Sequence, residues 1–382
     1  MSEAAPPPPP LPTPSSPAAA PMTFSCTSCG AQMTYAPGTT AMRCPSCGTE
    51  QQIESQLQIV EHSYDAWAAV PPKPVALIGK QVLTCEGCGA TTETDEYSDI
   101  CQFCGGALVV ASEPDGLIVP EAVVPFALNR TTANMAYAAW VKSRWFAPNA
   151  LKAVGSTDAI KGTYVPHWTF DAKTQSDYVG ERGEHYYVTE TVPVSDGKGG
   201  THMETMEVMR TRWSPASGHV ARDFDDVVVP ANRRLPIDRL DKMGPWNLTV
   251  AKHFDPHYLA GYAALRYDLD PDAGLAVAKT QMQDVITGDC RGDIGGDEQR
   301  VTQLSVQYTA LMFKLVLLPI WVASYLYAGK RYQVMINANT GEVVGDRPYS
   351  KVKIAFAVLG ALIVIAAIVA IYLAASSSGG SS

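Results

Sequence analysis

The run IAFAVLGALIVIAAIVAIYLA fills residues 354–374 of this 382-residue chain and contains no charged residue, Asn, Gln or Pro. As an α-helix it would extend about 31 Å, which is close to the hydrocarbon thickness of a bilayer. A backbone inside lipid must satisfy its own polar groups, and a helix does so. The run therefore predicts one transmembrane helix, because a buried core helix is rarely this long and this uniformly apolar.

Basic residues flank this helix on one side only. Lys351 and Lys353 stand just before it and Arg347 slightly earlier, whereas residues 375–382 carry no charge. By the positive-inside rule, the amino-terminal side faces the cytoplasm. The prediction is a single-pass protein of the cytoplasmic (inner) membrane, with a cytoplasmic N-terminus and a short extracytoplasmic tail at 375–382.

The opposite end of the chain has the composition of a disordered segment. Residues 1–21 contain nine prolines among Ala and Ser, with neither the basic nor the apolar region of a secretory signal. Such a segment cannot bury a core, so it is predicted to be a disordered tail, either an inert spacer or a proline-motif ligand.

Eight of the nine cysteines fall into four Cys-x-x-Cys pairs. The pairs form an internal repeat of two modules, residues 22–52 and 82–110, and every pair is followed by glycine. Glycine tolerates the positive φ that such a knuckle requires. Four thiolates at this spacing suit tetrahedral Zn²⁺ with no open position, whereas a redox Cys-x-x-Cys would be one exposed pair beside a βαβ unit. The sequence predicts two zinc ribbons holding two structural Zn²⁺ ions, with the ligands Cys26, Cys29, Cys44, Cys47, Cys85, Cys88, Cys101 and Cys104.

Residues 53–81 join the two ribbons and begin with apolar residues spaced by three and four, from Ile53 to Trp67. This spacing predicts a helical linker whose apolar stripe docks on a ribbon or on the following domain.

Residues 116–350 have the composition of a globular domain, predicted to be α+β with a largely antiparallel sheet. Asp270 and Pro271 predict a helix start, and the helix is expected to continue to near Gly288. A second helix is expected at 131–146. Strands are expected at 164–170, 186–194, 204–213, 219–229, 258–269, 301–308, 315–328 and 332–336, with turns at 214–218 and 337–342.

Several segments together resemble a bacterial family of membrane-anchored double-zinc-ribbon proteins. They are the paired CxxCG ribbons, ValProPheAlaLeuAsn (124–129), TyrValProHisTrpThrPhe (164–170), LeuLeuProIleTrp (317–321) and the following segments 329–337 and 340–350. Members are often labelled primosomal-helicase-like or transcription-factor-IIB-type zinc ribbons. The resemblance implies partners of the flotillin-like (SPFH-domain) or phage-shock type at a stressed membrane.

The sequence shows no catalytic motif. It lacks the phosphate loop that a helicase needs, and 195–201 is interpreted as a hairpin loop. Residues 268–274 imitate the start of an EF-hand, but Ala273 and Lys279 stand where glycine and glutamate are required. The histidines are expected to be ordinary hydrogen-bonded residues, Cys290 a structural thiol, and the acids at 223–226 and 293–298 solvated.

Charge argues against nucleic acid as the ligand of the ribbons. Residues 22–110 hold nine acids and three bases, so this region should repel phosphates. The sequence thus predicts a non-enzymatic adaptor or scaffold whose zinc ribbons recruit cytoplasmic proteins to the bilayer. A nucleic-acid-associated factor is the alternative, and a hydrolase using the central histidines is a third possibility.

Overall fold

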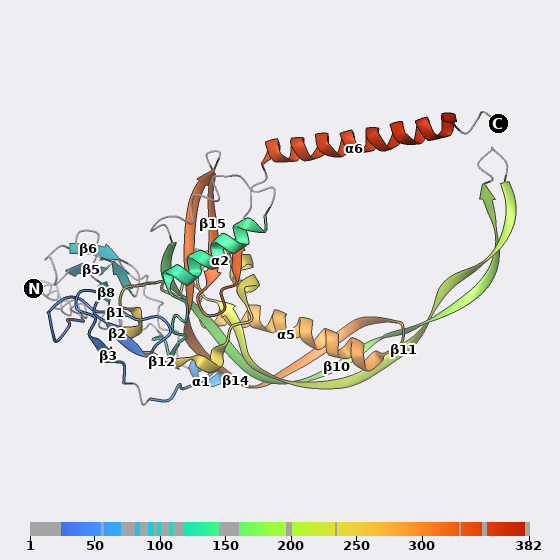
Figure 1. Cartoon of the computed structure of the whole chain (residues 1–382). Coiled ribbons are helices and arrows are strands. Elements are labelled where there is room, and N and C mark those ends of the chain that lie inside the picture. The colour runs from blue at the N-terminus through green and yellow to red at the C-terminus, as the bar shows by residue number, and fades with distance from the viewer. Residues whose placement is uncertain are drawn as a thin grey trace, which may run out of the picture.

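The computed structural model describes most of the chain. The described residues are 24–54, 57–69, 81–84, 91–94, 98–100, 107–109, 118–144, 160–195, 201–233, 235–327, 330–345 and 350–378. The tail at 1–21 and the four cysteines of the second ribbon lie outside them. The architecture is mixed α and β, dominated by one large sheet, as the sequence predicted (Figure 1).

Three very long strands form the centre of the sheet. Strand β10 (Ile160–Ser195) lies between β11 (Thr201–Pro230) and β14 (Glu298–Tyr327) and is antiparallel to both. The first two join as a hairpin, because Ser195 pairs with Thr201 across residues 196–200. The sequence predicts only shorter strands within each of these three.

The turn predicted at 214–218 is wrong, because these residues continue β11 and pair with residues 178–182 of β10. Pro215 is tolerated because, among the described strands, β11 pairs only with β10 and is therefore an edge strand, a place where sheets accept proline. Gly218 is required by packing: a Cβ there would lie 2.6 Å from the Tyr178 hydroxyl and 2.7 Å from Asp293.

Short strands complete the outer edge of β14. They are β4 (His62–Ser63), β9 (Ala122–Val123) and β15 (Lys330–Asn337), followed by β16 (Val343–Gly345) on the far side of β15. The predicted pairing of 315–328 with 332–336 is confirmed. The turn after Asn337 is also confirmed, since the Asn337 side chain accepts hydrogen bonds from the amides of Asn339 and Thr340.

Smaller strands extend and flank this sheet. The sheet continues through β12 (Lys252–His253), β13 (Ala263–Ala264), β7 (Ser98–Ile100) and β8 (Ala107–Val109), while β5 (Gln81–Thr84) and β6 (Thr91–Thr94) pair with each other. The strand predicted at 258–269 is wrong apart from β13. Its first residues form a 3-10 helix, Pro256–Leu259, and Gly261 follows with a φ of +89°.

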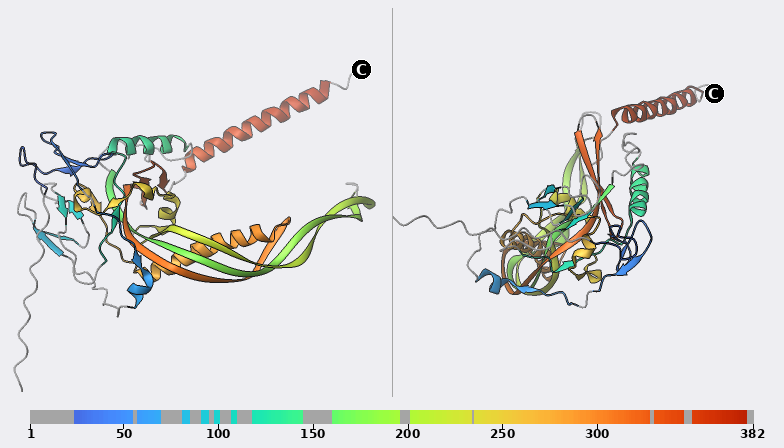
Figure 2. Two further views of the ribbon diagram at one scale, coloured as in Figure 1. Left: turned by 90° about the horizontal axis from the view of Figure 1, so that it is seen from below. Right: turned by 90° about the vertical axis from the view of Figure 1, so that its left-hand side faces the viewer.

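Helix α5 (Pro271–Ile294) covers one face of the long strands, as Figures 1 and 2 show. Its predicted cap is confirmed: the Asp270 carboxylate accepts a hydrogen bond from the Ala273 amide. The helix runs beyond Gly288 because Cys290 and Ile294 still find apolar partners on the sheet. Cys290 is fully buried in this cluster, consistent with a structural thiol. Helix α2 (Arg130–Lys142) lies near the position predicted for it.

The sheet narrows into an arm away from the core. Strand β14 begins at Glu298, opposite Gly183. Beyond this pair β10 and β11 continue without β14 as a two-stranded ribbon (Figure 1). Tyr187, Met203 and Met209 are exposed on this ribbon. We refer to residues 184–195 and 201–212 as the arm.

The helical linker prediction holds only over α1 (Tyr64–Ala68). Ile53 joins the core of the first ribbon, and Tyr64 and Trp67 pack near Phe313 of β14. Leu57 and Val60 are exposed, and the described residues 57–61 are not helical. The apolar residues of this segment therefore contact the first ribbon and β14 from an extended chain, in which His62 and Ser63 pair with β14.

Helix α6 (Lys351–Ser378) contains the apolar run and projects from the body (Figures 1 and 2). Its window Lys353–Ala370 is long and apolar enough to cross a membrane, and none of that window is buried against the protein.

Candidate functional site

Four cysteines of the first ribbon converge as the sequence predicted. The sulfur atoms of Cys26, Cys29, Cys44 and Cys47 all lie within 4.8 Å of one another. Two of the separations are 3.5 Å, from Cys26 to Cys47 and from Cys29 to Cys44. Tetrahedral zinc with Zn–S bonds of about 2.3 Å places its ligands about 3.8 Å apart, so the cluster fits a four-thiolate metal ion.

Each knuckle turns on the glycine that follows its cysteine pair. Gly30 has a φ of +73° and Gly48 a φ of +77°. Their amides donate to the carbonyls of Cys26 and Cys44 at 2.8 and 2.9 Å. These tight turns direct further amides at the sulfurs: those of Ser28 and Cys29 lower the pKa of Cys26. Both glycines therefore serve the backbone role predicted for them.

The cysteine cluster is built on a small sheet that packs into the body. Strands β1 (Thr34–Tyr35), β2 (Ala41–Arg43) and β3 (Glu50–Gln52) form this sheet. Buried Met33, Tyr35 and Met42 share one apolar core with Tyr258 and Tyr262. The first ribbon is therefore an integral layer of the body, with Cys29 and Cys47 exposed on its outer side. The second set, Cys85, Cys88, Cys101 and Cys104, lies outside the described residues.

A second cluster of ionisable groups, which the sequence does not predict, lies on the central sheet. The ammonium of Lys314 on β14 lies 2.6 Å from Glu61 and 2.5 Å from Asp226. Only 9% of the Lys314 side chain is exposed. The carboxylate of Asp171 joins this group, and oxygens of Glu61, Asp171 and Asp226 lie within 4.8 Å of one another.

Two β-bulges bring these carboxylates together. The register of β10 shifts around Asp171 against both of its neighbours. Asp226 on β11 has a φ of +54°, and its amide donates to Asp171 at 2.6 Å. On β14, Ala310 has a φ of +50° at the matching place. Bulges re-aim side chains, and here they direct Asp171 and Asp226 toward one another. Asp226, expected to be solvated, is therefore partly buried in an ion pair, whereas Asp223 and Asp225 are exposed as expected.

The protonation of this cluster follows from its burial. Burial, together with a hydrogen bond to Glu61, raises the pKa of Asp171 to about 7. The same hydrogen bond from Asp171 lowers the pKa of Glu61. Burial by itself would lower the pKa of Lys314, but hydrogen bonds to Asp226 and Glu61 outweigh it and raise that pKa. The cluster is therefore a salt bridge beside a carboxyl group that holds its proton to a higher pH than an ordinary aspartate does.

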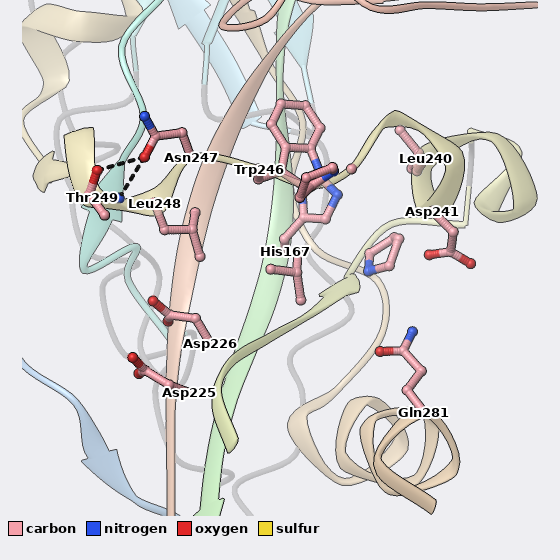
Figure 3. A pocket seen from close by; sticks show the side chains of 14 residues that line it. His167, Asp225, Asp226, Leu240, Asp241, Trp246, Asn247, Leu248, Thr249 and Gln281 are labelled. Atoms are coloured by element: carbon pink, nitrogen blue, oxygen red, sulfur yellow. Dashed lines mark hydrogen bonds between the residues drawn. The ribbon is translucent and has the colours of Figure 1, made fainter. Parts of the chain in front are cut away.

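A cavity of about 540 Å³ shares Asp226 with this cluster, and Figure 3 shows the residues that line it. His167 of β10 and the ring of Trp246 border it, with ring centroids 5.9 Å apart. Nδ1 of His167 lies 2.9 Å from the Val165 carbonyl, so this nitrogen carries the proton. Burial lowers the pKa of His167 to about 4, which keeps the ring neutral. The remaining cavity-lining residues are Asp225, Asp226, Val228, Pro230, Leu240, Asp241, Gly244, Pro245, Asn247, Leu248, Thr249 and Gln281.

Other histidines match the expectation of ordinary hydrogen-bonded residues. His185 contacts Glu298 at 2.9 Å, His219 contacts Asp177 at 3.0 Å, and His257 contacts Asp255 at 2.5 Å. The side chain of His202 lies outside the described residues. Asp293, expected to be solvated, is exposed on α5, where it also accepts a hydrogen bond from the Tyr178 hydroxyl at 2.6 Å.

Comparison with known proteins gives one relative. The chain is 27% identical over 349 residues to the Bacillus subtilis (strain 168) protein named "Uncharacterized protein YdjG", a match covering 87% of this chain and 92% of the relative. No protein-family model matches the chain. No solved structure matches it either. The similarity extends over nearly the whole chain, and the name of the relative assigns no activity.

Proposed function

We propose that this protein is a non-enzymatic adaptor that recruits cytoplasmic proteins to the inner membrane. The observation that carries the proposal is α6, an apolar helix that leaves its whole candidate span exposed while attached to a large folded body. Exposed apolar surface of that extent is stable in lipid and not in water. Lys351 and Lys353 favour a cytoplasmic body with residues 375–382 outside.

The metal ions have a structural role in this proposal. Four thiolates complete the tetrahedron of Zn²⁺ and leave no position for substrate or water. The first ion would complete the layer that packs against Tyr258 and Tyr262. The second would be held by Cys85, Cys88, Cys101 and Cys104, giving two Zn²⁺ ions per chain.

The arm is the surface proposed to contact the partner. Tyr187 and Met209 are directly paired across its two strands, and both are exposed. Met203 lies farther along the same face, opposite Pro193. Methionine adapts to partner surfaces of varied shape, and aromatic anchors dominate many interfaces. The resemblance suggests an SPFH-domain protein as the partner.

The test uses the full-length protein in native membranes. A photo-crosslinking residue replaces Tyr187, and the double variant Tyr187→Ser, Met209→Ser is compared by affinity recovery. The double variant should remain in the membrane fraction and lose the cytoplasmic partner. Val277→Ser on α5, also an exposed apolar position, is the matched control and should keep it.

Two results would count against the proposal. One is unchanged partner recovery with the double variant. The other is salt-sensitive binding of DNA by the full chain, which would favour the nucleic-acid alternative. Deleting residues 22–110 is a poor test, because it would remove Tyr35 and Met42 from the core of the body.

A further inference from the structure

The cavity beside His167 has the features of a small-molecule site. Its volume of about 540 Å³ lies within the range of small-molecule sites in proteins. Its walls come from β10, β11, α5 and the segment 240–249, so they are parts of one folded body (Figure 3). Adaptor function does not require such a site.

The charges that line the cavity are all of one sign. Asp225, Asp226 and Asp241 contribute carboxylates, and no lysine or arginine is among its described lining residues. Asp226 also accepts from Lys314, which borders a neighbouring cavity of about 380 Å³. The lining therefore attracts cations and repels phosphates and carboxylates.

His167 supplies an independent indication of a ligand. The residue is only 1% exposed, and its Nε2 has no hydrogen-bond partner among the described residues. Because Nδ1 donates to Val165, Nε2 carries a lone pair and can only accept. Buried polar atoms of this kind are uncommon and call for a donor.

The remaining lining suits an organic ion better than a bare metal ion. The indole of Trp246 offers a π face of the kind that attracts ammonium and guanidinium groups. Val228, Pro230 and Leu248 provide apolar wall for a hydrocarbon body. We infer that this cavity binds a small organic cation with N–H donors, such as an alkyl amine or guanidine, whose N–H groups bond to His167 and the aspartates while its body lies against Trp246.

The experiment titrates the full-length protein in detergent micelles with agmatine, which carries both an amine and a guanidinium group. Binding is measured by calorimetry and by the rise in thermal unfolding temperature. Asp225→Asn should weaken binding of agmatine by only about fivefold, because an exposed carboxylate contributes little to an ion pair. The neighbouring exposed variant Asp223→Asn, outside the cavity lining, should bind as the wild type does.

Two further variants separate the contribution of the buried acceptor, His167, from that of the negative charge of the cavity. His167→Leu should weaken binding at least about tenfold, since it removes the buried acceptor. His219→Leu, at an exposed histidine, should have no effect. The inference is overturned if agmatine gives no saturable binding, if Asp225→Asn and Asp223→Asn bind equally, or if Mn²⁺ binds where agmatine does not. The Asp225 pair keeps the test decisive even if the His167 variant fails to fold.

Discussion

The ammonium nitrogen of Lys314 lies 2.6 Å from a carboxylate oxygen of Glu61, a residue 253 positions earlier in the chain. This contact fastens the extended segment after the first ribbon to the centre of the sheet. Beside this contact, the two residues of β4 pair with β14, the strand that carries Lys314. The segment after the first ribbon is thus held by this contact, by the His62–Glu121 contact at 2.7 Å and by the short ladder, in addition to its apolar packing.

Replacing Lys314 with methionine should lower the free energy of unfolding by about 3 kcal/mol, because it leaves Glu61 and Asp226 as unpaired, partly buried charges. Chemical denaturation in detergent micelles measures the change. Lys173→Met is the control: Lys173 and Asp223 are 3.9 Å apart and exposed, so its cost should stay below about 0.5 kcal/mol. Equal losses in the two variants would show that the Lys314 contact is not a stabilising one.

The pH dependence of stability should be dominated near neutrality by Asp171. Its pKa in the folded protein is about 7, above the unfolded value, so the native state holds an extra proton between these two values. Stability should therefore fall as pH rises from about 5 to 8. Glu61, whose pKa is lowered, contributes stability that is lost only in more acidic solution.

The variant Asp171→Asn should remove most of the fall in stability with rising pH near neutrality. The amide oxygen can still accept from the Asp226 amide, and the new NH₂ group can donate to Glu61 at every pH. Unfolding temperatures of wild type and variant are compared at about pH 5.5, 7.0 and 8.5, values that lie on both sides of the pKa of Asp171. A variant with the wild-type slope would assign the titration to another group.

Two glycines of α5 should respond oppositely to alanine. A Cβ at Gly274 would lie 2.8 Å from the Trp168 ring, so Gly274→Ala should destabilise by about 1–3 kcal/mol. Nothing lies within 4 Å of a Cβ at Gly288, so Gly288→Ala should stabilise by about 0.5–1 kcal/mol through helix propensity. Thermal unfolding of the two single variants measures both. If both alanine variants are more stable than the wild type, Gly274 is not in tight contact with the Trp168 ring.

Elemental analysis of purified protein should find two zinc ions in the wild type and one in Cys26→Ser. Because Cys26 shares its core with Tyr258, this variant should also show faster amide exchange around residues 258–264. Cys290→Ala, at a buried thiol outside the cluster, should keep both ions. Iron–sulfur absorbance in protein purified without oxygen would contradict the zinc assignment.

Membrane orientation can be read from a single added thiol. In intact cells, a membrane-impermeant maleimide should label Ser378→Cys and leave the otherwise unchanged protein unlabelled. A cysteine placed near residue 10 should react only after the cells are opened. Labelling near residue 10 in intact cells, without labelling at position 378, would reverse the proposed orientation.

Features set by neighbouring residues were predictable from the sequence. The Asp270 cap, the turn after Asn337 and the knuckle glycines Gly30 and Gly48 each depend on a few adjacent positions. The apolar run of α6 is equally local. These elements follow from propensity and capping, with little contribution from distant packing.

Features set by distant partners were not predictable in this way. Ser214–Gly218 form strand because β10 pairs with them along their whole length, which overrides a local turn signal. The Lys314 cluster combines three strands and a linker through two bulges. One signal was present: Lys314 is a single cation within the apolar run LMFKLVLL, where a buried strand would require a partner for it.

The order in which the long strands appear during synthesis follows from their positions. Strands β10 and β11 are available to pair once Pro230 has been made, but β14 begins only at Glu298. Until then the edge of β10 that β14 will cover is bare and can pair with another growing chain. Nascent chains on one polysome therefore have an interval in which they can cross-pair, and slow translation between these two strands would lengthen it.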